Sequence, residues 1–209
     1  MAFTDGDLRP ALLGAVPSTA AEAEALVRTI HPGHEVTPSE GGFLTRLSYP
    51  PDNVTYATVL AGAEILCDNR LVLNRPSELP AHLVKLGADR RILMHGMHSG
   101  VDWHCFAVWE NGTLIRSLSL SPGGGIAENI GEPFAFERSF WAGDHPVDPD
   151  PGDEDEELYP LPFHPLDLGE EALRALFGFV LESYPNPDDI NADSVRLHGF
   201  LVRERRGTD

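Results

Sequence analysis

The side chains best suited to chemistry lie in one short segment, His95-Gly96-Met97-His98, which is followed by Asp102 and His104. Imidazole nitrogens and carboxylate oxygens are common ligands of zinc and related metals. The segment also lies at the end of a predicted strand, where functional residues are often found. One interpretation is therefore a metal-dependent hydrolase that uses His95, His98 and Asp102.

The spacing of these residues argues against a metal centre. His95 and His98 are an odd number of residues apart, so in an extended chain they point to opposite faces. The His-Glu-x-x-His pattern of helical zinc sites is absent from the sequence. His104 lies among aromatic residues, where a hydrogen-bonded core histidine is expected. We therefore expect these side chains not to converge on one ion, and we predict no cofactor.

Other catalytic patterns are weaker. Ser99 and His98 are sequence neighbours, and no Gly-x-Ser-x-Gly motif is present to place a serine nucleophile. His104 and Cys105 are adjacent in a predicted strand, so their side chains face opposite ways. Gly123-Gly124-Gly125 follows a strand, but the Lys and the Ser or Thr of a phosphate-binding loop are missing, and we expect a flexible turn there.

A second candidate site consists of aromatic residues in a segment without regular periodicity. These residues alternate with acidic side chains and one arginine, and they are Phe134, Phe136, Phe140 and Trp141. Aromatic side chains anchor protein interfaces, so the segment predicts a partner-binding edge. The alternative is that the rings hold their own loop on the domain. The sequence leaves both interpretations open.

The charge of the chain limits its partners. The sequence contains 33 acidic and 15 basic residues, which gives a formal net charge of −18. This excess of negative charge argues against binding to nucleic acid or to an anionic membrane. A basic protein partner is compatible with it. Nothing in the composition indicates an oligomeric state.

The sequence contains no signal for export or membrane insertion. Residues 1–9 lack the basic and apolar regions of a secretion signal, and no apolar run approaches about 18 residues. The two cysteines, Cys67 and Cys105, form no Cys-x-x-Cys pair and are expected to be reduced core residues. We therefore predict a cytoplasmic protein.

Hydrophobic periodicity predicts the elements that position these residues. Helices are expected over 19–30, 78–86 and 169–183, the first with a capping box formed by Thr19 and Glu22. Strands are expected over 54–60, 64–67, 70–73, 91–94, 103–109, 113–120 and 195–202. Asn111-Gly112, between two of these strands, is a strong hairpin signal.

The hairpin arm over 103–109 is apolar on both faces, which is typical of a strand inside a sheet covered on both sides. We therefore predict an α+β fold in a single domain over residues 1–209. It has a central mixed or antiparallel sheet covered on both faces, about three helices and long irregular loops. Within it, residues 144–160 are predicted to form an acidic surface loop rich in proline and glycine.

Several irregular strings in the sequence look familiar. They lie over 76–80, 107–110, 116–122, 128–133 and 172–179. On these segments, and over nearly the whole chain, the sequence resembles an uncharacterised actinobacterial family described only as a domain of unknown function. The resemblance implies a bacterial intracellular protein and no activity. It also implies an apolar strand that begins before residues 2–7, so either the start site here is late or this member lacks half of that strand. A composition with Lys85 as the only lysine agrees with a GC-rich bacterial source.

Two classes of function follow from these observations. We favour a non-enzymatic binding or accessory module whose interface comes from the aromatic segment and the neighbouring acidic loop. The alternative is the metal-dependent hydrolase described above. The binding module is preferred because no catalytic geometry can be built from the sequence, so an enzyme is not expected.

The acidic loop gives a first testable prediction. Residues 148–157 are all Asp, Glu, Pro or Gly, so they cannot bury apolar surface. Replacing them with a short Gly/Ser linker should change the melting temperature by only about 1–2 °C. A loss of about 2 kcal/mol or more in the free energy of unfolding would show instead that the loop packs on the domain.

Overall fold

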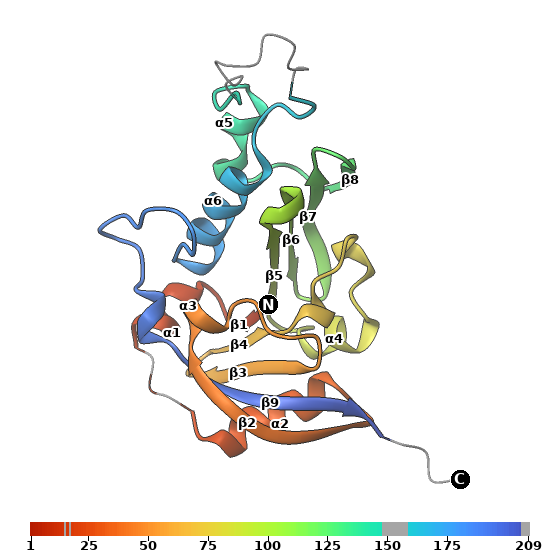
Figure 1. The fold of residues 1–209 in the computed structure, drawn as a ribbon, viewed down its shortest axis with the longest axis vertical. Coiled ribbons are helices and arrows are strands. Elements are labelled where there is room, and N and C mark those ends of the chain that lie inside the picture. The colour runs from red at the N-terminus through yellow and green to blue at the C-terminus, as the bar shows by residue number, and fades with distance from the viewer. Residues whose placement is uncertain (15, 17, 148–158, 206–209) are drawn as a thin grey trace.

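A computed structural model describes residues 1–14, 16, 18–147 and 159–205. In this part of the chain, nine strands form one sheet in the order β2-β9-β3-β4-β1-β5-β6-β7-β8, as Figure 1 shows. The strands are β1 Ala2–Thr4, β2 His34–Phe43, β3 Val54–Leu60, β4 Ala63–Cys67, β5 Arg91–His98, β6 Trp103–Glu110, β7 Thr113–Ser121, β8 Gly125–Ile130 and β9 Arg196–Glu204. The α-helices are α1 Leu8–Leu13, α2 Ala20–Ile30, α3 Leu44–Leu47, α4 Ala81–Leu86, α5 Arg138–Trp141 and α6 Pro165–Phe177.

The prediction of an α+β domain with about three helices and a central mixed or antiparallel sheet covered on both faces is wrong. The described residues form a single nine-stranded sheet in which every pairing is antiparallel. They include six α-helices, of which only α2 and α6 are longer than six residues. The two edge strands are also mostly exposed: Val36 is the only buried residue of β2, and Glu128 is the only buried residue of β8.

The segments whose secondary structure was predicted wrongly differ from the prediction for local reasons. The edge strand β2 contains Pro38, Gly41 and Gly42, which are typical of loops, and β8 follows a glycine run. The strand predicted over 70–73 is absent, because residues 69–71 form a 3-10 turn in which Asp68 accepts a hydrogen bond from the backbone N–H of Arg70. Of the acidic loop predicted over 144–160, residues 148–158 lie outside the described residues.

The strongest local signals are confirmed. The turn between β6 and β7 places Asn111 at φ 51° and Gly112 at φ 75°, the left-handed backbone that an Asn-Gly hairpin requires. At the start of α2, the Thr19 hydroxyl accepts from the backbone N–H of Glu22 at 3.3 Å, and the Glu22 carboxylate accepts from the backbone N–H of Thr19 at 2.8 Å. The capping box therefore sets the start of this helix.

Helix α6 begins four residues before and ends six residues before the predicted helix over 169–183. Pro165 occupies the first helical position, and the imidazole of His164 accepts from the backbone N–H of Leu166 at 3.3 Å. Gly178, at φ 85°, ends the helix in the left-handed conformation. No helix in the described residues is long and apolar enough to cross a bilayer.

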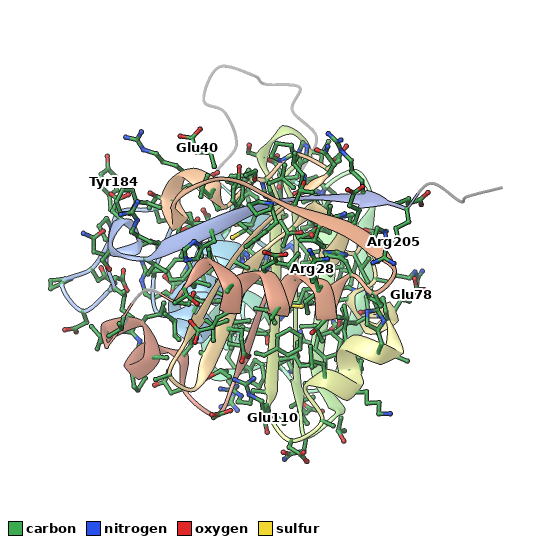
Figure 2. All side chains as sticks on the ribbon, turned by 90° about the horizontal axis from the view of Figure 1, so that it is seen from below. Arg28, Glu40, Glu78, Glu110, Tyr184 and Arg205 are labelled. Carbon is green, nitrogen blue, oxygen red and sulfur yellow. The ribbon has the colours of Figure 1, made fainter. Side chains whose placement is uncertain are left out.

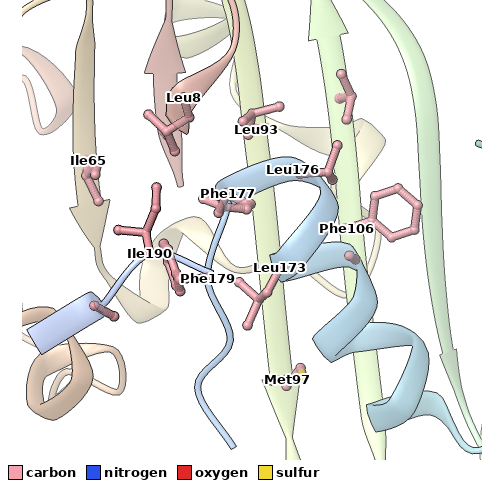
Figure 3. Close-up of a cluster of buried hydrophobic side chains, with 14 of the residues drawn as sticks. Leu8, Ile65, Leu93, Met97, Phe106, Leu173, Leu176, Phe177, Phe179 and Ile190 are labelled. Atoms are coloured by element: carbon pink, nitrogen blue, oxygen red, sulfur yellow. The ribbon is translucent and has the colours of Figure 1, made fainter. Parts of the chain in front are cut away.

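Alternate residues of β5 contribute to two apolar clusters on opposite faces of the sheet. Leu93 and Met97 belong to the cluster beneath α6, which Figure 3 shows together with Leu173 and Leu176 of that helix. Ile92 and Met94 belong to the cluster on the other face, which includes residues of α2 and α4. Figure 2 shows α2 lying across this face. Strand β5 is therefore buried from both sides although the sheet edges are not.

A buried ion pair fixes the chain between β8 and α5. Arg116 of β7 is completely buried, and its guanidinium donates to Glu137 with Nη2–Oε2 and Nε–Oε1 distances of 2.6 and 3.0 Å. The same guanidinium also donates to the side chain of Asn129 and to the carbonyls of Ile130 and Gly131. Each of its three nitrogens thus has an acceptor, as a buried arginine requires.

This pair yields a stability prediction. Arg116→Met should lower the free energy of unfolding by about 3–5 kcal/mol, because it leaves the buried Glu137 carboxylate without its cation. The double variant Arg116→Met/Glu137→Leu should be less destabilised than the single variant, as measured by urea denaturation.

The control is Arg91→Met, which removes a partly exposed pair with Glu110 (Nε–Oε1 3.1 Å). It should cost no more than about 1 kcal/mol. An Arg116→Met protein as stable as the Arg91→Met control would contradict the role given to the buried pair.

Candidate functional site

The histidines and carboxylate of the proposed metal site lie apart. His98 is exposed at the end of β5, and Asp102 ends the following 3-10 turn at φ 48°. The Asp102 carboxylate lies 3.7 Å from Nε2 of His164, on the segment that leads into α6. Among the described residues, no group of three or more His, Cys, Asp or Glu side chains is placed to hold a metal ion. The structure therefore does not bring His95, His98 and Asp102 into one site.

His95 is instead paired with His104 beneath α6. The two rings lie on the same face of β5 and β6, with their centroids 5.1 Å apart. His95 Nε2 is 2.9 Å from the carbonyl of Gly169, and His104 Nδ1 is 3.2 Å from the carbonyl of Gly96. Since a carbonyl only accepts, each of these nitrogens carries the proton. The unprotonated nitrogens are Nδ1 of His95 and Nε2 of His104, and the latter is buried without a partner among the described residues.

Burial keeps both imidazoles neutral. It lowers the pKa of His104 to about 4, against which the hydrogen bond to Gly96 acts only weakly. Burial, and after it the neighbouring His104, holds the pKa of His95 well below its usual value. At neutral pH the pair therefore offers hydrogen-bond acceptors and not positive charge.

The aromatic candidates pack inward. Phe140 is buried in the cluster beneath α6, and Phe134, Phe136 and Trp141 are partly buried against it. The rings of Phe134 and Phe136 lie 6.5 and 5.7 Å from the ring of Phe106 on β6. These residues therefore anchor their own segment. That a protein partner binds these aromatic residues stays a prediction.

A surface groove of about 480 Å³ borders this segment and α6. It is lined by Ala135, Phe136, Ser139, Phe140, His145, Asp167, Glu170, Glu171 and Ser183. The exposed ring of His145 stacks on Phe140 with a centroid distance of 4.0 Å, and the Ser139 hydroxyl lies 3.0 Å from Nε2 of His145. The groove thus combines ring surfaces with carboxylates.

The three carboxylates of the groove differ in what they bind. Glu170 is buried and accepts from the backbone N–H groups of Leu181, Glu182 and Ser183 at 3.0, 3.1 and 3.3 Å, so it holds the segment after α6. Glu171 forms an ion pair with Arg174. Asp167 is exposed and has no hydrogen bond or ion pair from its side chain among the described residues. It is the carboxylate that a ligand in the groove can reach.

Comparison with known proteins places the chain in a family without assigning it an activity. The family of unknown function DUF6928 matches residues 1–200. The chain belongs to this family. The resemblance to a family of unknown function is therefore confirmed over nearly the whole sequence. No curated protein and no solved structure matches this DUF6928 chain, so its site has to be argued from its own geometry.

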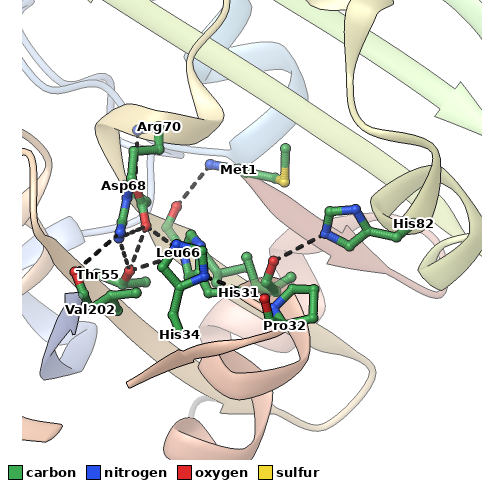
Figure 4. A network of polar contacts seen from close by, with 11 residues as sticks. Met1, His31, Pro32, His34, Thr55, Leu66, Asp68, Arg70, His82 and Val202 are labelled. Carbon is green, nitrogen blue, oxygen red and sulfur yellow. Dashed lines mark hydrogen bonds and ion pairs between the residues drawn. The ribbon is translucent and has the colours of Figure 1, made fainter. Parts of the chain in front are cut away.

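A polar network in this DUF6928 protein escaped prediction from sequence. Asp68 is buried, and its carboxylate binds His31 (Oδ2–Nε2 2.8 Å), Arg70 (Oδ2–Nη2 2.7 Å) and the hydroxyl of Thr55, as Figure 4 shows. The residues come from separate elements, and only the Asp68-x-Arg70 spacing gives a local signal. These donors and the backbone N–H of Arg70 occupy the carboxylate, so the network stabilises the fold.

The same network predicts an acid-sensitive stability. Burial raises the pKa of the Asp68 carboxyl, but hydrogen bonds from His31, Arg70 and Thr55 outweigh burial and hold it well below the usual value. Its contribution to stability is therefore complete above the unfolded-state pKa of about 3.9 and is lost as the pH falls through the lower folded-state pKa.

Asp68→Asn should lower the free energy of unfolding at neutral pH by about 1–3 kcal/mol. It should also make stability fall less steeply with acidification below about pH 4, measured by urea denaturation across pH. If the free energy of unfolding of the two proteins depended on pH in the same way, the pKa of Asp68 would not be lowered in the folded protein.

Proposed function

We propose that this protein is a non-enzymatic binding module whose groove at α5 and α6 receives a basic side chain of a protein partner. The observation that carries the proposal is the carboxylate of Asp167, which has no partner among the described residues and lines the groove together with the rings of Phe136 and His145. A carboxylate beside ring faces suits an arginine, which pairs with the anion and stacks on the ring. The groove volume of about 480 Å³ accommodates such a side chain.

The charge of the chain supports a basic partner. The net charge is −18, and the groove segment continues directly in sequence into residues 148–157, of which seven are Asp or Glu. Such a concentration of negative charge attracts a basic polypeptide and speeds its encounter with the groove. It also disfavours nucleic acid and anionic membranes as partners.

A hydrolytic function receives less support. The Ser139–His145 pair has a hydrogen-bonding distance of 3.0 Å, but a serine nucleophile also needs a group that orients the histidine. Of the neighbouring carboxylates, Glu170 and Glu171 are bound by other donors. Asp167 lines the same groove but makes no hydrogen bond or ion pair with His145 among the described residues. The metal-dependent alternative based on His95, His98 and Asp102 has no converging ligand set among the described residues.

The cellular setting belongs to the same proposal. A bacterial, actinobacterial and cytoplasmic protein is what the composition and the family resemblance favour, with arginine almost completely replacing lysine. An arginine-rich partner would be common in such a proteome.

The proposal predicts saturable binding of a basic peptide. The probe is a fluorescent peptide of alternating Arg and Ser residues, and the measurement is anisotropy at low and at physiological salt. Binding should weaken with salt, and a peptide with Glu in place of Arg should not bind. Asp167→Lys should weaken binding at least about tenfold, because it puts a cation where the arginine would sit.

The matched control is Glu78→Lys, which makes the same change in net charge at an exposed position outside the groove. It should weaken binding less than about twofold, as expected for long-range charge alone. The Gly/Ser replacement of residues 148–157 should slow association without changing stability. Equal losses for Asp167→Lys and Glu78→Lys would reduce the interaction to unspecific attraction and overturn the proposed site.

A further inference from the structure

Two small hollows adjoin each other beneath α6. Their volumes are about 80 and 90 Å³. Five residues line both of them, namely Ser48, Asn69, Val72, His95 and Leu181. His95 is thus the imidazole that the two spaces have in common, and neither hollow contains a residue of the groove.

Most of the remaining wall is apolar. Helix α6 and the segment after it contribute most of this wall, namely Leu173, Phe177, Phe179 and Leu181. Leu44 and Ile65 complete it. Val72 closes the wall against β5, where Gly96 leaves no room for a side chain because a Cβ there would lie 2.4 Å from Val72 Cγ1. The charged groups in the lining are the Asp68 carboxylate and the amino group of Met1, which donates to the carbonyl of Leu66 at 2.9 Å. Because both are bound by the protein and the rest of the wall is apolar, the hollows favour an uncharged ligand.

Among the described residues, two polar groups that line both hollows have no hydrogen-bond partner: the hydroxyl of Ser48 and Nδ1 of His95. The Asp68 carboxylate is held by His31, Arg70 and Thr55, and the Asn69 amide donates to the carbonyl of Pro50 at 2.6 Å. His95 donates through Nε2 to the Gly169 carbonyl, so its Nδ1 is an acceptor. Nδ1 has no protein donor among the described residues. A ligand with one O–H group would complete it.

The size of the hollows sets the size of the ligand. A cavity of about 150 Å³ with apolar walls is sufficient to hold benzene. Two adjoining spaces of about 80 and 90 Å³ offer room of the same order. We infer that this protein has a second binding site, in which His95 Nδ1 accepts a hydrogen bond from the hydroxyl of a neutral molecule about as large as phenol. This site is independent of the proposed protein-binding groove.

The probe for this site is phenol, followed by NMR of the His95 ring nitrogens in the purified full chain. Saturable binding is expected with a dissociation constant of about 1 mM, and the Nδ1 resonance should shift as it accepts the hydrogen bond. Toluene has the ring but no donor and should bind at least about fivefold more weakly. Benzoate should bind more weakly than phenol, because burying its charge against a largely apolar wall beside the Asp68 carboxylate costs free energy.

Three variants decide the location. His95→Phe removes the acceptor and should abolish binding, while His98→Phe, on the same strand but exposed, should leave it unchanged. Leu181→Trp fills the shared part of both hollows and leaves His95 in place, so it remains informative if His95→Phe fails to fold. Phenol that binds Leu181→Trp as well as the unaltered protein, or that never saturates, would overturn the inference. If the hollows hold only water, phenol binding would not saturate.

Discussion

The guanidinium of Arg116 sits in the interior with no exposed surface, so each of its donors has to be met by the chain that surrounds it. Those acceptors come from the end of β8, from the turn after it and from Glu137. Glu137 in turn accepts from the backbone N–H of Phe134 at 2.7 Å. One cation therefore fixes where the aromatic segment starts, and with it one wall of the groove.

The other wall depends on how closely α6 approaches the sheet. Gly169 allows this approach, because a Cβ at that position would lie 2.4 Å from the sulfur of Met97 and 3.1 Å from Nδ1 of His104. The same contact brings the Gly169 carbonyl to His95 and sets the protonated nitrogen of that ring. The groove and the hollows both border α6 and thus share one structural origin, although they suit ligands of opposite character.

Local signals predicted local structure. The hairpin around Asn111-Gly112 and the capped helix that follows Thr19 were readable because their stabilising contacts lie within a few residues. The edge strands β2 and β8 were not, because partner strands and not their own alternation hold them in the sheet. The site depended still more on distant contacts. His95 was recognised as notable, but its partner Gly169 is 74 positions away, and no spacing rule brings them together.

The strand order has a consequence for biosynthesis. β9, formed by residues 196–204, is inserted between β2 and β3 and is the only strand that pairs with β2 among the described residues. During translation, β2 leaves the ribosome long before β9 and meanwhile has no neighbour to pair with. β3 likewise presents an open edge through most of synthesis. The nascent chain therefore cannot join β2 to the rest of the sheet until β9 emerges, and pairing between strands so far apart in sequence is expected to slow folding.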